Sequence, residues 1–131
     1  ADKPFVTLNF KMPAFIFILA LFLCNVIGCR KTENGPVYTG RLEIDGICGN
    51  YTITSLNGGL DTTQVQANWT DPNTGIAYTN VFGLTNHCDF PDSFQAGDTF
   101  SFRIVSRNGS CVQCLAFYPT PAKSLSIQVV P

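Results

Sequence analysis

From Val37 to the end of the chain, hydrophobic and polar residues alternate in short runs, and this pattern restricts the fold more than any other feature. In the run Arg41–Asp45, for example, Leu42 and Ile44 alternate with three charged residues. A period of two places successive side chains on opposite faces of an extended strand, so each run predicts a strand with one buried and one solvent-facing side. The runs lie at residues 41–45, 51–55, 64–69, 76–82, 100–104 and 125–129.

Turn-forming residues separate these runs, as expected for a β domain of short strands. Asp71–Gly75, with the sequence DPNTG, lies between two of them and predicts a hairpin. After Val37 no 12-residue window carries a helical stripe of hydrophobic residues. Only Pro91–Gln95 has the composition of a single helical turn, with proline near its start. The sequence therefore predicts one small all-β domain with a modest core.

Two architectures satisfy this pattern, because a small closed barrel and a sandwich both protect the edges of a sheet. The order of the runs, with a short helical or looped segment at residues 90–94 before the last strands, resembles an OB-like antiparallel barrel. We expect such a barrel with one short helical turn. An immunoglobulin-like β-sandwich is the alternative.

The N-terminal part has the order of a secretory signal peptide. Lys3 and Lys11 precede an uncharged run from Pro13 to Gly28. Its apolar part is about 13 to 16 residues long, which is shorter than the roughly 20 residues that a membrane-spanning helix needs. We therefore expect a cleaved export signal in residues 1–28.

The end of this run resembles a bacterial lipobox. Val26–Cys29 has the sequence VIGC, with a branched apolar residue at position −3 and a small residue before the cysteine. The resemblance implies cleavage after Gly28 and attachment of diacylglycerol to the sulfur of Cys29, and two or more acyl chains give stable membrane anchoring. A plain signal peptide, and hence a secreted protein, is the alternative.

The lipobox divides the chain into residues 1–28 as signal peptide, residues 29–36 as a lipidated tether and residues 37–131 as the β domain. The residue after Cys29 is Arg30 rather than aspartate. By resemblance to bacterial sorting rules, this favours the outer membrane, with the domain facing the periplasm. The expected partner is thus the membrane, through a lipid anchor.

Three segments of the domain resemble a group of small secreted bacterial lipoproteins with an OB-like barrel. They are DGICGNYTITSLNGG at residues 45–59, VFGL followed by FPDSFQAGDTFSFRI between residues 81 and 104, and SLSIQVV at residues 124–130. The resemblance covers residues 40–130. It implies a fold and a location, and because the group has no characterised activity it implies no function.

Four cysteines remain after removal of the signal peptide and lipidation of Cys29. In a small exported domain, Cys48, Cys88, Cys111 and Cys114 indicate two disulfides. Residues three apart on a strand point to opposite faces, so we expect Cys48 and Cys88 to pair with Cys111 and Cys114 in an order that stays open. A thioredoxin-like redox pair of Cys111 and Cys114 and a zinc site of all four cysteines are the competing hypotheses.

The rest of the sequence favours binding over catalysis. The net charge of −1 provides no basic face for nucleic acid. The single histidine, His87, lies in a loop without a nucleophile motif, so we expect no catalytic residue, no metal and no cofactor. Most aromatic residues are needed for the core, but Trp69 lies just before a turn and is a candidate for contact with a ligand.

Three functions follow in order of preference. The first is a non-enzymatic, lipid-anchored cell-envelope protein that acts as a binding or structural module with an unidentified protein or glycan partner. The second is a glycan- or peptide-binding domain that uses exposed aromatic residues, with Trp69 among them. The third is a thiol oxidoreductase that uses Cys111 and Cys114.

Overall fold

The computed structural model describes Pro4 and residues 35–106, 111–112 and 114–131. The chain divides into two units, Ala1–Thr32 and Glu33–Pro131. All the strands described below belong to the second unit, which contains the segment that the alternating pattern predicts to be β structure.

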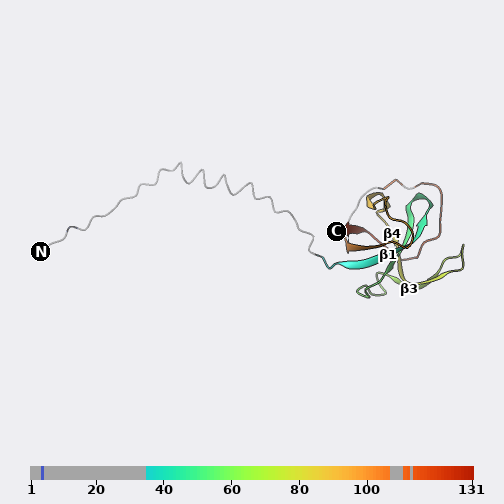
Figure 1. The fold of residues 1–131 in the computed structure, drawn as a ribbon, viewed down its shortest axis with the longest axis horizontal. Coiled ribbons are helices and arrows are strands. Elements are labelled where there is room, and N and C mark those ends of the chain that lie inside the picture. The colour runs from blue at the N-terminus through green and yellow to red at the C-terminus, as the bar shows by residue number, and fades with distance from the viewer. Residues whose placement is uncertain (1–3, 5–34, 107–110, 113) are drawn as a thin grey trace. The chain divides into compact units, whose positions relative to one another are not determined.

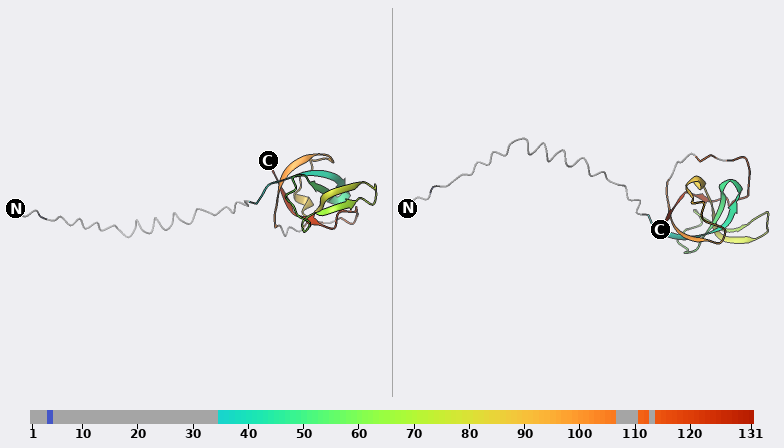
Figure 2. Two further views of the ribbon diagram at one scale, coloured as in Figure 1. Left: turned by 90° about the horizontal axis from the view of Figure 1, so that it is seen from below. Right: turned by 45° about the horizontal axis from the view of Figure 1, so that its top comes forward.

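The described residues of the second unit form seven strands, and strands are drawn as arrows in Figures 1 and 2. They are β1 (Tyr38–Gly46), β2 (Asn50–Ser55), β3 (Gln66–Thr70), β4 (Ala77–Leu84), β5 (Thr99–Ile104), β6 (Ser124–Leu125) and β7 (Ile127–Val130). They join one hydrogen-bonded sheet in the order β3-β4-β2-β1-β5-β7, with β6 paired to β4. The prediction of a mainly antiparallel all-β domain is confirmed, and its strands share one sheet, whereas an immunoglobulin-like sandwich has two.

The last predicted run, residues 125–129, contributes to two strands rather than one. β6 pairs in parallel with β4 through Gly83 and Leu84, and β7 pairs antiparallel with β5. Ser126 separates the two strands, and its carbonyl accepts a hydrogen bond from the Val105 N–H at 3.0 Å. The C-terminal segment therefore links β4 to β5, two strands that are not neighbours in the order of the sheet.

In the part of the chain that the structure describes, the helical content consists of two 3-10 turns, η2 (Ile47–Gly49) and η3 (His87–Asp89), without an α-helix. At Pro91–Gln95, where the composition predicts a helical turn, the Phe94 N–H donates to the Pro91 carbonyl at 3.4 Å, and this one turn does not continue into a helix. Asp98 accepts a hydrogen bond from the Gln95 N–H at 2.9 Å and donates its own N–H to the Gln95 carbonyl at 3.0 Å. These bonds turn the chain into β5, and η3 occupies the connection between β4 and β5 instead.

The core lies between the strands and is rich in aromatic rings. Phe82 and Phe102 are fully buried with their ring centroids 5.7 Å apart, and Phe100 packs against Phe90 at 5.2 Å. Offset and tilted rings at such separations attract each other beyond the gain from burial. The aliphatic members are Leu42, Ile53, Leu60, Val65, Leu84 and Ile127. Most of these residues occupy positions that the alternating pattern assigns to the buried face.

Strand β2 departs from the predicted pattern, because both of its faces are buried. Tyr51, Ile53 and Ser55 alternate with Thr52 and Thr54, which predicts that the two threonines face solvent, yet both are buried. Thr52 pairs with Gly83 of β4, and a Cβ on Gly83 would meet the side chain of Thr120 at 3.4 Å. The segment that leads into β6 therefore covers the face of the sheet that alternation predicts to be exposed.

The predicted hairpin between β3 and β4 is confirmed. The Gly75 N–H donates to the Asp71 carbonyl at 2.8 Å, and the Asp71 N–H donates to the Ile76 carbonyl at 2.9 Å. The Asp71 carboxylate accepts the Asn73 N–H at 3.0 Å and the Thr74 hydroxyl at 2.8 Å. Gly75 has φ of +73°, a conformation that glycine adopts without strain. Side-chain bonding within the turn explains why this sequence forms a hairpin.

The connection after β4 is held against β7 by Asn86, which is almost fully buried. Its Nδ2 donates to the Ile127 carbonyl at 2.8 Å, and its Oδ1 accepts the Ile127 N–H at 2.9 Å. The side-chain amide of Asn86 thus satisfies both the N–H and the carbonyl of the buried Ile127. Without it, these two groups would need hydrogen bonds from a neighbouring strand. Asn86 fixes the start of η3, and so places His87 and Cys88.

Candidate functional site

The two 3-10 turns contact each other and form one wall of the candidate site. In η2, Cys48 and Gly49 both have positive φ, of 58° and 71°. A Cβ on Gly49 would collide with the ring of His87 in η3. Only glycine both tolerates this backbone and lets η2 approach the imidazole.

Each turn carries a cysteine that is bonded to the connection between β5 and β6. The disulfides are Cys48–Cys114 and Cys88–Cys111, with Cα–Cα distances of 5.8 Å and 5.9 Å, in the ordinary range for a disulfide. The two long-range bridges expected from the cysteine count are confirmed, and their order is now assigned. The connection between β5 and β6 is thereby attached to both turns.

One expectation about this connection is wrong. Residues 111–112 and 114–117 form no strand, whereas the argument for long-range pairing placed Cys111 and Cys114 on one. Cys111 and Cys114 are not bonded to each other, so the pair required by the hypothesis of a Cys111–Cys114 oxidoreductase does not form. Both cysteines form disulfides with residues of the 3-10 turns. These two long-range disulfides, rather than strand pairing, attach the segment to the sheet.

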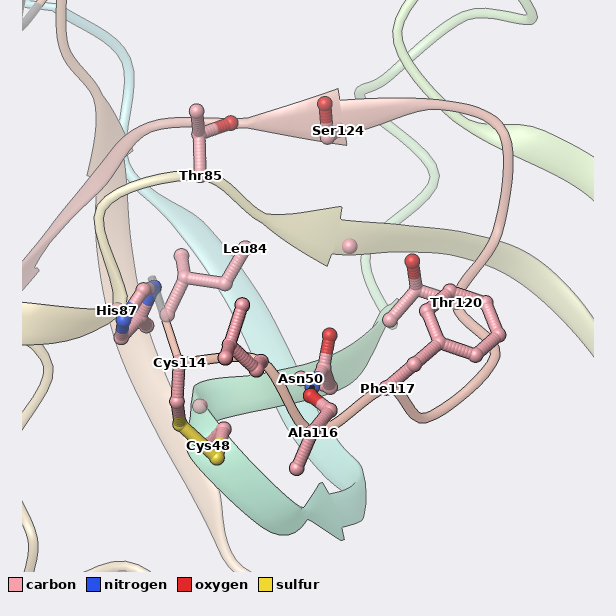
Figure 3. Close-up of a pocket in the computed structure, with 13 residues that line it drawn as sticks. Cys48, Asn50, Leu84, Thr85, His87, Cys114, Ala116, Phe117, Thr120 and Ser124 are labelled. Atoms are coloured by element: carbon pink, nitrogen blue, oxygen red, sulfur yellow. Dashed lines mark hydrogen bonds between the residues drawn. A yellow bond between two sulfur atoms is a disulfide. The ribbon is translucent and has the colours of Figure 1, made fainter. Parts of the chain in front are cut away.

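A pocket of about 440 Å³ lies between η2, the end of β4 and this connection (Figure 3). Its wall contains the Cys48–Cys114 disulfide, with His87 nearby, and the side chains of Thr120 and Ser124. The described residues that line it are Cys48, Gly49, Asn50, Gly83, Leu84, Thr85, His87, Cys114, Leu115, Ala116, Phe117, Thr120 and Ser124. None of these carries a carboxylate, an ammonium or a guanidinium group, so the lining is polar without a permanent charge.

The rim of the pocket is strongly apolar. Leu115 is fully exposed, with a relative exposure of 105%, and Phe117 is 79% exposed. Asn50 supports this rim, since its Nδ2 donates to the Ile47 carbonyl at 2.7 Å and to the Ala116 carbonyl at 3.4 Å. The apolar rim is therefore tied to the sheet by an amide as well as by a disulfide.

One buried polar atom lies beside the pocket without a partner. The Thr52 hydroxyl has no hydrogen bond among the described residues and no exposed surface. Thr52 lies on the same face of β2 as Asn50, and its register partner is Gly83. Both neighbours line the pocket. A hydroxyl buried without a hydrogen bond costs free energy, so this position is energetically unfavourable as it stands.

His87, which the sequence places in a loop and which we would expect to be exposed there, belongs to the 3-10 turn η3. It is half-buried, and its Nε2 lies 3.1 Å from the sulfur of Cys111. That sulfur also accepts the Cys88 N–H at 3.1 Å. The signal that pointed to this contact was the adjacency of His87 and Cys88 in the sequence, because a disulfide at Cys88 brings a second sulfur to the same place.

The potential ligand atoms of His87, Cys88 and Cys111 all lie within 4.8 Å of one another. Zinc is bound by thiolates, and in this structure both sulfurs are joined in a disulfide. The four cysteines form two separate bridges, so the arrangement does not fit the hypothesis of a four-cysteine zinc site.

Trp69 lies on β3, half-buried, and stacks on Tyr78 of β4 with ring centroids 6.0 Å apart and an interplanar angle of 27°. The two are register partners across the hairpin. Burial, followed by the charges of Glu43 and Asp71, raises the pKa of Tyr78. Trp69 is absent from the described lining of the 440 Å³ pocket, so the structure does not bring it together with the disulfides.

The connection between β5 and β6 also reaches the β3–β4 hairpin. The Tyr118 hydroxyl donates to the Asp71 carboxylate at 3.0 Å. Burial alone would raise the pKa of Asp71, but the hydrogen bonds from Asn73, Thr74 and Tyr118 outweigh it and the pKa is lowered. The same connection thus contacts both 3-10 turns and the hairpin.

The proposed lipidation site, Cys29, lies outside the described residues, together with most of residues 1–28 and of the tether. In the part of the chain that the structure describes, no helix has the length and hydrophobicity needed to cross a bilayer. No protein-family model, no curated protein and no solved structure matches the chain.

Proposed function

We propose that this chain is a non-enzymatic, lipid-anchored protein of a bacterial cell envelope that binds a neutral glycan in the pocket beside the Cys48–Cys114 disulfide. The single observation that carries the proposal is the pocket, with its uncharged polar lining and its exposed apolar rim. Sugar rings present hydroxyl groups at their edges and C–H groups on their faces. Hydroxyl and amide side chains beside an aromatic ring match both features.

The strand pairing supports an OB-like barrel for this domain. The parallel pair β4–β6, the antiparallel pair β5–β7 and the central position of β1 are the pairings that such a barrel would use. In OB-folds the connection between the first two strands and the connection before the last strand bind oligonucleotides or oligosaccharides. Here these connections are η2 and the disulfide-bonded segment, and both line the pocket. The net charge of −1 favours the glycan over a polyanionic oligonucleotide.

Binding is favoured over hydrolysis by the same lining. A glycoside hydrolase uses two carboxyl groups on either side of the bond that it cleaves. The described lining of the pocket contains neutral side chains instead. We therefore propose a module that holds a glycan without cleaving it.

The anchor is tested separately from the binding. The intact mass of the full chain, extracted from the membrane fraction of an expressing bacterium, should correspond to residues 29–131 with diacylglycerol on Cys29. The Cys29→Ser variant should lack the lipid mass and leave the membrane fraction. A mature protein that retains residues 1–28 would contradict the lipoprotein proposal, whatever it binds. Fractionation of inner and outer membranes then tests the proposed outer-membrane location.

Glycan binding is tested by calorimetric titration of the full chain with a tetramer of N-acetylglucosamine. The Phe117→Ala variant should bind about threefold to tenfold more weakly, because stacking on an aromatic ring contributes about 0.5–1.5 kcal/mol beyond its buried area. Ile76→Ala is the matched control, since Ile76 is an exposed apolar residue on the β3–β4 side. Equal weakening by both variants, or no saturable binding, would contradict the pocket as the glycan site.

The Trp69–Tyr78 stack is a second candidate surface for a glycan or a peptide, favoured by the partial exposure of both rings. Trp69 is the single tryptophan of the chain, so fluorescence excited at a wavelength that tryptophan absorbs and tyrosine does not reports on this surface. A ligand at the stack changes the emission of Trp69 and its binding is insensitive to Phe117→Ala. A ligand in the pocket gives the opposite result.

A further inference from the structure

We propose that Cys88–Cys111 is a thiol–disulfide exchange site that reacts with a dithiol, while Cys48–Cys114 is a stable structural bridge. The two bonds attach the same segment to the sheet and have similar Cα–Cα distances. They differ in what surrounds the sulfur atoms, and that difference carries the inference. It does not depend on a lipid anchor or on a glycan.

The sulfur of Cys111 lies between two groups that donate hydrogen bonds to a thiolate. The His87 Nε2 is 3.1 Å away, and the Cys88 backbone N–H is also 3.1 Å away. Nε2 bears a proton in the imidazolium and in one neutral tautomer, and in either form it donates to a negatively charged sulfur. Among the described residues, neither sulfur of Cys48–Cys114 has such a partner.

The position of the imidazole is maintained by packing rather than by chance contact. Gly49 lies against the ring of His87 so closely that a side chain there would displace it. Asn86, immediately before the ring, is fixed by two hydrogen bonds to Ile127. Packing against Gly49 and the anchoring of Asn86 therefore both keep the imidazole beside Cys111.

Exposure determines which sulfur is attacked. Cys88 is exposed and Cys111 is half-buried. A thiolate of the dithiol attacks the Cys88 sulfur, the Cys88–Cys111 bond breaks, and its electron pair leaves on the Cys111 sulfur. Hydrogen bonds from His87 and from the Cys88 N–H stabilise that departing thiolate, and a better leaving group speeds exchange.

The second half of the exchange completes the electron balance. The second sulfur of the dithiol, as a thiolate, attacks the dithiol sulfur that is bonded to Cys88. This releases Cys88 as a thiolate. The dithiol becomes a cyclic or internal disulfide, and the two thiolates of the protein take up two protons. Two electrons and two protons have then passed from the dithiol to Cys88–Cys111, and in the reverse reaction the two protein thiols reduce a disulfide partner and form the Cys88–Cys111 bond again.

The proposal is tested on the purified full chain with dithiothreitol as the dithiol. Samples are quenched with acid and alkylated at intervals, and peptide mapping gives the fraction of each bridge that has opened. Mapping assigns every alkylated cysteine, so Cys24 and Cys29 do not enter the comparison. Cys88–Cys111 should open about tenfold faster than Cys48–Cys114 or more, since the leaving thiolate is stabilised only in the first.

The role of the imidazole is tested with His87→Phe, which keeps a ring against Gly49 and removes both ring nitrogens. In this variant the opening of Cys88–Cys111 should slow by about tenfold, while the rate at Cys48–Cys114 in the same molecule stays unchanged. With glutathione as a monothiol, the mixed disulfide should be found on Cys88 rather than on Cys111.

Each alternative result overturns the proposal. Equal opening rates in the wild-type protein, or faster opening of Cys48–Cys114, would show that the surroundings of Cys111 do not activate the bond. A rate unaffected by His87→Phe would remove the imidazole from the mechanism. If that variant fails to fold, the order of opening and the site of the glutathione adduct in the wild-type protein still decide the question.

Discussion

Asn86→Ala is the substitution from which we expect the largest effect of a single polar side chain on the free energy of unfolding. The change removes both hydrogen bonds to the backbone of Ile127, a residue that is only 3% exposed. A buried backbone group without a partner costs about 1–3 kcal/mol. Two such groups give about 2–6 kcal/mol, and partial entry of water into the vacated space favours the lower part of that range. We expect a loss of about 3 kcal/mol.

The assay is urea unfolding of the oxidised protein at pH 7, with the free energy obtained by linear extrapolation. The midpoint should fall while the slope stays constant, because the area exposed on unfolding hardly changes. In a domain of this size, a loss of about 3 kcal/mol lowers the melting temperature by roughly 10–20 °C. Asn57→Ala, at an exposed position in a turn, is the matched control and should change stability by less than about 0.5 kcal/mol. A loss below about 1 kcal/mol for Asn86→Ala would refute the reasoning.

Two further substitutions test buried polar groups. Tyr118→Phe removes a hydrogen bond to the charged Asp71 and should cost about 1–2 kcal/mol in urea unfolding at pH 7. Because the folded pKa of Asp71 is lowered, its stabilising contribution is present above the unfolded value near 4 and is lost as the pH falls through the folded pKa, so the effect of Tyr118→Phe should vanish there. Thr52→Val replaces an unpaired buried hydroxyl with a methyl group and should raise thermal stability by about 1 kcal/mol.

Matched controls separate these effects from simple loss of an oxygen atom. Tyr38→Phe should be nearly neutral at both acidic and neutral pH, since no hydrogen bond of the Tyr38 hydroxyl is seen among the described residues. Thr54→Val should gain less than Thr52→Val, because of these two hydroxyls that of Thr52 is the one buried without a hydrogen bond to the described residues. A pH-independent loss for Tyr118→Phe would show that it does not act through Asp71. A destabilised Thr52→Val would show that the hydroxyl has a partner.

The all-β class, the strand positions, the Asp71–Gly75 hairpin and the existence of two long-range disulfides could all be predicted from the sequence. These features depend on local physics. Alternation with a period of two decides which side chains share a face, turn residues bond to their own backbone, and an even number of cysteines in a small exported domain indicates bridges. The lipobox at Cys29 belongs to the same class of short-range signal, and it stays a prediction.

The tertiary structure decided everything that depends on segments distant in the chain. The pairing order of the cysteines required the two 3-10 turns to meet, and they meet because Gly49 leaves room for the ring of His87. Thr52 is buried because Thr120, nearly 70 residues later in the chain, covers its register partner Gly83. The local sequence of β2 could not predict this contact. The sequence by itself thus determined the strands and the number of bridges. Only packing decided which sulfur lies beside the imidazole, and with it the chemistry that we propose for Cys88–Cys111.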